Sequence, residues 1–331
     1  MSKLRRLLKR FVIFLLLFII FIYLNNTSIF SNDRGRDPLL LAHRGMAQTF
    51  TMDEIKWDTC TAERIYKPEH PYLENTLPSI QAAFDQGADV VEFDIKRTKD
   101  NQFAVFHDAT LECRTDQKGE PSEFTMNELK QLDIGYGYTA DDGQTYPFRG
   151  KGIGLMPSLA EVLSQFQERD LLIHIKSNLK GDGELLVAYL EKLPPEQLEL
   201  IAVYGDDEPI RVLKEKMPGL RVMSLETMKS CLLPYIAVGW TGYVPSACKN
   251  TQLHIPEVYA KYLWGFPMKF LNRMEDANTR VIVVAGDAGW SEGFDSIEDL
   301  ERLPENYNGG IWTNRIDRIG KHGDGFTASE K

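Results

Sequence analysis

The chain of 331 residues has few cysteines, and no two of the four are spaced as a C-x-x-C pair. This spacing argues against a zinc knuckle. The chain also lacks an excess of basic residues, because its net charge is -10 at pH 7. Nucleic acid is therefore not expected as a partner, since binding a phosphate backbone requires a basic surface. No G-x-G-x-x-G follows the first predicted strand. This motif is the usual signature of an open sheet that binds a dinucleotide, so its absence argues against such a sheet.

The N-terminus predicts a membrane anchor. Its first ten residues contain five cations and no anion, and the apolar run Phe11–Leu24 follows. The run is shorter than the roughly twenty residues that span a bilayer unaided, but apolar neighbours on both sides extend it. The alternative is a cleavable signal peptide, which the absence of an A-x-A-like site disfavours. We expect a cytoplasmic basic tail at 1–10, an uncleaved transmembrane signal anchor at 11–30 and a linker at 31–38. The positive-inside rule then places the remaining chain outside the cytoplasm, in a periplasmic or extracellular space.

The four cysteines would then lie in an oxidising compartment, where an even number suggests two disulfides. Three pairings are possible. We favour Cys60–Cys113 and Cys231–Cys248, the second because it closes a short loop, and free buried thiols are the alternative.

Short apolar runs alternate with helical segments over most of the chain, which predicts an α/β fold. We expect eight strands, at Leu39–Ala42, Val90–Ile95, Ala104–His107, Leu171–Lys176, Glu199–Tyr204, Leu220–Ser224, Arg280–Val284 and Ile311–Asn314. Eight such units suit a (β/α)8 TIM barrel at 39–320, and a doubly wound open sheet is the alternative. Residues 109–154 have no strong periodicity and form an expected insertion after the third strand. We expect a flexible tail at 321–331.

The second predicted strand carries charge on one face. Side chains alternate along a strand, so Glu92, Asp94 and Lys96 share one face. Charged groups are costly to bury unless they are paired or bind a metal, and two carboxylates two positions apart can supply oxygen ligands to a cation. A solvated edge strand is the simpler interpretation of this segment alone.

Polar residues also gather where other predicted strands end, and in barrels this end of the strands holds the active site. The pairs are His43/Arg44, Glu92/Asp94, His107/Asp108, His174/Lys176 and Thr313/Asn314. The remaining histidines, His70, His254 and His322, are expected to be ordinary surface residues, the first two in loops beside prolines.

Several motifs in this order resemble the glycerophosphodiester phosphodiesterase family. They are LAHRG (Leu41–Gly45), ENT (Glu74–Thr76), the run Gly87–Asp100, VFHD (Val105–Asp108), MPSLAEVL (Met156–Leu163) and IHIK (Ile173–Lys176). The resemblance implies a TIM barrel with a region inserted after the third strand and one divalent metal ion, usually calcium or magnesium. It also implies hydrolysis of glycerophosphodiesters to glycerol 3-phosphate and an alcohol.

The resemblance further implies roles for individual residues. His43 and His107 match the acid/base histidines, Arg44 and Lys176 the cations that hold the phosphate, Glu92 and Asp94 the metal ligands, and Glu74 a carboxylate near the metal. One position departs from the family, because His174 stands where a third metal carboxylate is usual. Imidazole suits manganese or zinc better than calcium or magnesium, so these metals become alternatives.

The sequence thus predicts a membrane-anchored, metal-dependent phosphodiesterase that acts on a small-molecule or lipid phosphodiester by His/His acid-base catalysis. Two alternatives stay open: a phospholipase D-like enzyme on lysophospholipid or sphingomyelin, and an inactive barrel that binds phosphodiesters or a protein. The sequence gives no indication of the oligomeric state.

Overall fold

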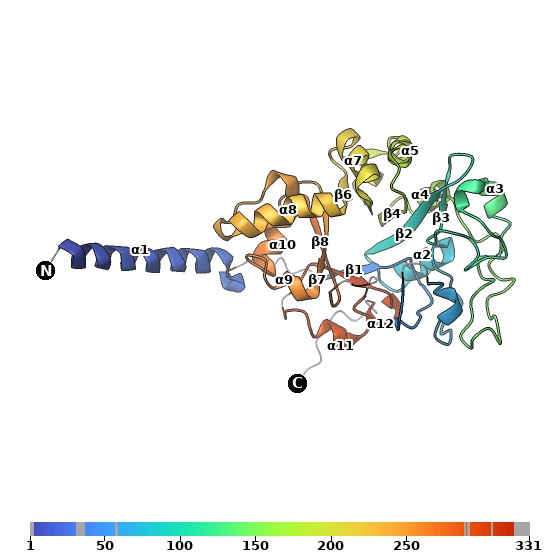
Figure 1. The fold of residues 1–331 in the computed structure, drawn as a ribbon, viewed down its shortest axis with the longest axis horizontal. Helices are drawn as coiled ribbons and strands as arrows, with labels where there is room; N and C mark the ends of the chain where they lie inside the picture. The colour runs from blue at the N-terminus through green and yellow to red at the C-terminus, as the bar shows by residue number, and fades with distance from the viewer. Residues whose placement is uncertain are drawn as a thin grey trace.

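The computed structural model describes residues 3–30, 37–56, 59–287, 289, 292–305 and 307–320. The expected tail at 321–331, with His322, and most of the expected linker at 31–38 lie outside these residues. Within them the chain forms an α/β domain and one long helix, α1 (Lys3–Asn26), which projects from it (Figure 1). By length and composition α1 could cross a membrane, a property that it would share with a signal sequence.

Eight parallel strands of the domain form a barrel. In chain order they are β1 (Leu39–Ala42), β2 (Val90–Arg97), β4 (Asp170–Ile175), β5 (Ile201–Gly205), β6 (Arg221–Met223), β7 (Gln252–Pro256), β8 (Arg280–Val284) and β9 (Gly310–Thr313). Hydrogen bonds link them in the order β6-β5-β4-β2-β1-β9-β8-β7. A parallel bridge between Val222 and Thr251 brings β6 to the start of β7. The predicted TIM barrel is confirmed as a nearly closed ring.

Helices connect most of these strands on the outside of the barrel (Figure 1). They are α2 (Leu77–Asp85), α4 (Leu159–Gln165), α5 (Lys180–Leu190), α6 (Pro195–Leu198), α7 (Asp207–Lys216), α8 (Leu225–Val238), α9 (Glu257–Ala260), α10 (Met268–Glu275), α11 (Ile297–Leu300) and α12 (Ile316–Ile319). Short 3-10 turns are η1 (Ser28–Phe30), η2 (Ala62–Arg64), η3 (Pro121–Glu123), η4 (Gly239–Thr241) and η5 (Ser246–Cys248). Thr76 and Ser158 cap α2 and α4, because each accepts a hydrogen bond from the backbone N–H three residues later.

The inside of the barrel has an apolar floor and a polar mouth. Leu41, Val90, Leu172, Ala202, Ile282, Val284 and Trp312 form one buried cluster. Strand side chains alternate, so the residue two positions further along faces the same way. On β1, β2, β4 and β5 these next residues are His43, Glu92, His174 and Tyr204. The strands thus place polar groups one layer above the apolar cluster.

One predicted strand is not part of the barrel. The third, expected at Ala104–His107, is β3 (Phe103–Val105), and it pairs antiparallel with β2. The reason is its short connection, because a turn from Thr98 to Gln102 can join antiparallel strands only, whereas parallel strands require a long crossover. The eighth barrel strand is β7, in a segment where no strand was expected. Its polar residues Gln252 and His254 alternate with apolar ones, so β7 lacks the continuous apolar run by which the other strands are identified.

The insertion follows β3 and builds a second core. Buried residues from it, including Leu111, Tyr138 and Phe148, pack with Leu73 and Phe106, and α3 (Met126–Leu129) lies within it. Both predicted disulfides are confirmed. Cys60–Cys113 ties the loop after β1 to the insertion, and Cys231–Cys248 joins α8 to η5.

Candidate active site

The chain leaves β1 in a sharp turn that carries His43 and Arg44. Arg44 and Gly45 both adopt positive φ, at 58° and 74°. A Cβ atom at Gly45 would lie 2.8 Å from the backbone of Ser79, so only glycine fits here. The backbone N–H of Arg44 donates to Glu92 Oε2 at 3.0 Å. The turn is thereby fixed to the charged face of β2.

Glu92, Asp94 and His174 bring one ligand atom each to within 4.8 Å of one another. Asp94 and His174 are register partners on neighbouring strands, and His174 Nδ1 lies 2.9 Å from Asp94 Oδ1. Both carboxylates are fully buried, and the His174 imidazole is the polar neighbour of Asp94 Oδ1. Such a pair is costly without a cation, and carboxylate oxygens with an imidazole nitrogen suit a divalent metal. These three residues therefore fit one divalent ion.

Glu74 lies beside this cluster, but its carboxylate contacts two arginines. Arg44 Nη1 is 2.9 Å from Glu74 Oε1, and Arg114 Nη1 is 3.1 Å from Oε2. Arg44 also places its Nε 3.3 Å from Asp94 Oδ2. Glu74 thus holds Arg44 in position at the edge of the carboxylate pair, and it is not among the three residues whose ligand atoms converge.

His43 and His107 are oriented in the same way. His43 Nδ1 is 2.7 Å from Asn314 Oδ1, and His107 Nδ1 is 2.7 Å from Asp108 Oδ1. Both partners are acceptors, so the proton of each neutral ring lies on Nδ1 and the lone pair on Nε2. His43 Nε2 lies 3.9 Å from Glu92 Oε2 and His107 Nε2 3.2 Å from Lys176 Nζ. Each histidine therefore presents Nε2 to the charged groups of the mouth.

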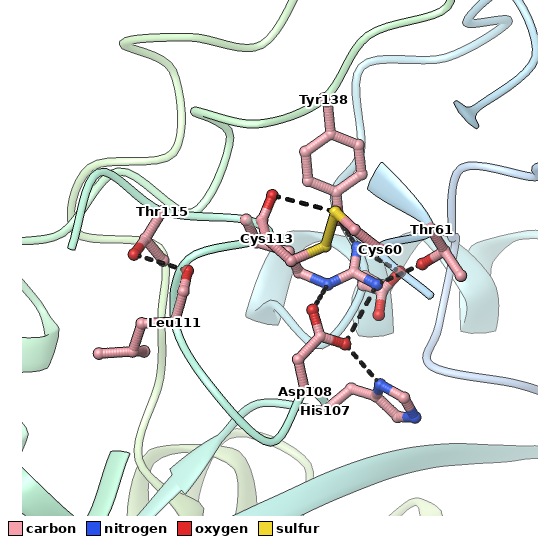
Figure 2. Close-up of a disulfide and its surroundings, with 10 residues drawn as sticks. Cys60, Thr61, His107, Asp108, Leu111, Cys113, Thr115 and Tyr138 are labelled. Atoms are coloured by element: carbon pink, nitrogen blue, oxygen red, sulfur yellow. Dashed lines mark hydrogen bonds and ion pairs between the residues drawn. A yellow bond between two sulfur atoms is a disulfide. The ribbon is translucent and has the colours of Figure 1, made fainter. Parts of the chain in front are cut away.

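The insertion supports the orientation of His107 (Figure 2). Arg114 Nε donates to Asp108 Oδ2 at 2.8 Å, and Arg114 Nη2 donates to Thr61 Oγ1 at 2.7 Å. Thr61 and Arg114 each follow directly after a cysteine of the Cys60–Cys113 disulfide. The covalent link therefore holds together the two segments that fix Asp108, and through it the imidazole.

Burial controls the protonation of the site. It lowers the pKa of His43 well below its ordinary value, and the positive charge of Arg44 lowers it further. Burial and Arg44 also lower the pKa of His107, and burial lowers the pKa of His174 to about 4. All three imidazoles are therefore neutral at pH 7, which leaves lone pairs for a proton or a metal.

The two carboxylates titrate in opposite directions. Burial, with repulsion from Asp94, raises the pKa of Glu92 to about 8. Burial alone would also raise the pKa of Asp94, but His107 and Arg44 hold it well below its usual range. Without a metal, the pair carries about one negative charge at neutral pH.

Aromatic rings line the mouth next to the charged cluster. The ring of Tyr204 stacks on His174 with centroids 4.0 Å apart, and its hydroxyl donates to Glu92 Oε1 at 2.8 Å. His254 lies between Tyr204 and Trp312, at 5.1 and 5.3 Å. The expectation that His254 is a surface residue in a loop is wrong, because β7 turns its side chain into the barrel, where burial lowers its pKa to about 3.

The structure brings together all eight predicted site residues and adds others. Asn75 donates from Nδ2 to Asp94 Oδ2 at 3.0 Å and accepts from the backbone N–H of Asp94 at 2.9 Å. It belongs to the ENT motif, so the sequence contained its signal. Tyr204 ends a predicted strand, and alternation from Ala202 would have placed it inward. Arg114 had no signal, because it lies in the insertion without periodicity.

The chain matches a known protein family over about half of its length. Residues 43–214 match the glycerophosphoryl diester phosphodiesterase family, which is more than half of the chain. The chain belongs to this family. The matched stretch runs from His43 into α7 and so includes all eight predicted site residues.

Individual members of the family are similar to this chain over only part of their length. A glycerophosphodiester phosphodiesterase of Caldanaerobacter subterraneus is 30% identical over 154 residues, which are 45% of this chain and 59% of that protein. The lysophospholipase D GDPD1 of Mus musculus is 33% identical over 181 residues, 52% of this chain and 53% of that protein. The chain thus spans little more than half the length of these two relatives.

A solved structure shares the fold. It is an Oleispira antarctica phosphodiesterase in complex with the product sn-glycerol-3-phosphate, with a TM-score of 0.52 at 20% identity. The alignment covers 84% of this chain and 93% of that structure.

Proposed function

We propose that this protein is a membrane-anchored, metal-dependent phosphodiesterase that hydrolyses glycerophosphodiesters to glycerol 3-phosphate and an alcohol. The observation that carries the proposal is the pair of imidazoles, His43 and His107, each with Nδ1 bound to an acceptor and Nε2 turned toward the buried charges. Family membership supports the same activity.

A phosphodiester is inert in water because its negative charge repels nucleophiles, so the site must neutralise that charge. Arg44 Nε lies 3.3 Å from Asp94 Oδ2 and Lys176 Nζ 3.2 Å from His107 Nε2, and we assign both cations to the phosphoryl oxygens. A divalent ion bound by Glu92, Asp94 and His174 would add positive charge at the same oxygens. Glu74 then serves to position Arg44 and is not assigned as a ligand.

The two histidines divide the proton transfers. In the first step one Nε2 takes the proton of the substrate's own glycerol hydroxyl, whose oxygen bonds to phosphorus. The bond from phosphorus to the alcohol breaks, and the other imidazole, which takes up a proton when the negatively charged phosphodiester binds, gives that proton to the leaving oxygen. Water then opens the cyclic phosphate with the roles reversed. Each transfer contributes about 10²–10⁴-fold to the rate.

The activity is tested with the full-length chain in lipid nanodiscs, assayed on glycerophosphocholine with and without a chelator. We expect release of glycerol 3-phosphate, loss of turnover on chelation and recovery when a divalent metal is added back. Turnover that survives complete metal removal would contradict metal dependence. A cyclic phosphate should appear in quenched reactions with a slow-leaving substrate.

A second candidate activity is phospholipase D-like cleavage of lysophospholipids. Two observations favour it: one relative is a lysophospholipase D, and α1 is long and apolar enough to cross a membrane. Lysophosphatidylcholine in the same assay decides between the two, according to which substrate has the higher kcat/KM. Turnover of neither substrate would favour a binding barrel.

Metal binding should depend on pH with a defined sign. Glu92 holds a proton at pH 7 in the metal-free protein, because its pKa is raised to about 8, whereas Asp94 is ionised. A metal must displace that proton, so binding at pH 7 should release about one proton. The affinity should rise from pH 6 to 8 and then level off. Titration calorimetry in buffers of different ionisation enthalpy measures the release, and an affinity that does not change with pH would contradict this protonation state.

A further inference from the structure

One exposed surface of the domain carries no charge. From Ser230 to Cys248 the sequence contains no charged residue and no histidine, although 26% of the chain is charged. The segment covers most of α8, η4 and η5, and the Cys231–Cys248 disulfide joins its ends. Leu233, Ile236 and Tyr243 from this segment are exposed. An exposed apolar surface of this kind marks a site of contact with another protein, a membrane or a ligand.

Further apolar side chains extend this surface. Tyr259 on α9 and Tyr262 just after it are exposed. Their segment is joined to α8 because Trp264 Nε1 donates to the carbonyl oxygen of Ile236 at 2.8 Å. We call the combined surface the uncharged patch, after the segment 230–248; it consists of Leu233, Ile236, Val238, Trp240, Tyr243, Tyr259 and Tyr262. The exposed Lys261 lies at its edge, with Nζ 5.3 Å from the centre of the Tyr262 ring.

The end of α1 is fixed to the uncharged patch. Asn25 and Asn26 each donate from Nδ2 to the carbonyl oxygen of Trp240 at 2.9 Å. Arg273 on α10 donates from Nη2 to the carbonyl oxygen of Asn25 at 2.8 Å. Figure 1 shows α8, α9 and α10 at the end of the domain from which α1 projects. The helix and the patch therefore have a fixed relative position.

The contact reaches into the apolar part of α1. The ring of Trp240 meets the ring of Phe18 edge-on, with centroids 5.3 Å apart. Phe18 lies two turns before Asn26, about 12 Å along the helix at 1.5 Å per residue. It belongs to the run Phe11–Leu24, which forms the core of the span. A bilayer that surrounds Phe18 must therefore also reach Trp240.

We propose that the uncharged patch lies in the interfacial layer of the bilayer that α1 crosses, so that the barrel is seated on the membrane at α8, η4 and α9. This inference rests on the membrane anchoring proposed above. Tryptophan and tyrosine favour the interface because their rings are apolar and their N–H and O–H groups reach water or head groups. Leu233 and Ile236 would lie deeper, against the acyl chains.

The uncharged composition and the position beside α1 favour lipid as the occupant. A second copy of the chain is the competing occupant, and the experiment separates the two. The native cysteines form disulfides and none of those described is free, so a single introduced cysteine can be labelled selectively.

The test uses full-length protein in phosphatidylcholine vesicles, with an environment-sensitive fluorophore on Ile236→Cys or Tyr262→Cys and with lipids brominated high on their acyl chains. Ile153→Cys is the matched control, because Ile153 is 59% exposed and Ile236 51%, but Ile153 lies in the insertion. Ile13→Cys on α1 reports the anchoring itself. We expect quenching by brominated lipid at Ile236, Tyr262 and Ile13, and none at Ile153.

Three outcomes would overturn the inference. Quenching at position 13 without quenching at positions 236 and 262 would support the membrane anchor and refute the contact between the patch and the bilayer. Absence of quenching at all positions would refute the anchor and the seating together. If the fluorescence of the label at position 236 is not quenched by brominated lipid but changes with the protein-to-lipid ratio, the patch binds a second copy of the chain.

Discussion

His107→Ala is expected to lower kcat by about 10²–10⁴-fold with little change in KM. The imidazole transfers a proton in the transition state and contributes little to binding of the substrate in its ground state. His43→Ala is expected to do the same. Both rings have Nδ1 engaged by an acceptor at 2.7 Å, so each has only Nε2 for chemistry, whereas His174 directs its Nδ1 at Asp94 in the proposed metal cluster. Steady-state kinetics on glycerophosphocholine measure the effect.

His70→Ala provides the matched control for these two variants. His70 is half-buried and contacts Gln48, outside the cluster of charges, so its loss should leave kcat near that of the wild type. Thermal unfolding of all three variants checks that the fold is retained. Near-wild-type kcat in either His43→Ala or His107→Ala would refute the proposed acid-base pair.

Asp94→Asn is expected to weaken metal binding by more than about 100-fold, because loss of even an outer partner of a ligand costs 10–100-fold. Asp94 is the carboxylate that stays ionised in the metal-free site, and it lies between His174 and Arg44. Activity should fall with metal occupancy. Paramagnetic resonance of Mn²⁺ distinguishes free from bound ion and so gives the affinity directly.

Two further variants sharpen this experiment. Asp182→Asn is the matched control, because Asp182 is also buried and paired with an arginine, Arg97, but outside the cluster. His174→Glu restores the carboxylate that the family usually has, and should shift the preference from manganese or zinc toward magnesium or calcium. Unchanged Mn²⁺ affinity in Asp94→Asn would exclude this cluster as the metal site.

Much of the fold could be predicted because its information is local. Apolar runs such as Leu39–Ala42 are buried on both faces in a parallel sheet, so their composition identifies them. The strand β7 could not be identified in this way. Gln252 and His254 point into the barrel, where they contact each other at 2.7 Å, so a buried strand resembles a polar loop in the sequence. The antiparallel pairing of β3 with β2 is a local property, since a five-residue turn cannot join two parallel strands.

The sequence by itself singled out the eight side chains proposed for the site: seven lie where predicted strands end, and Glu74 belongs to the ENT motif of the family that the chain resembles. For the cysteines it only favoured one of three pairings, and the structure decided for Cys60–Cys113 and Cys231–Cys248. Only the tertiary structure decided what each side chain does: that Glu74 faces two arginines, that Arg114 from the insertion steadies Asp108, and that His254 lines the barrel. These facts depend on contacts between segments far apart in the chain, which no local pattern encodes.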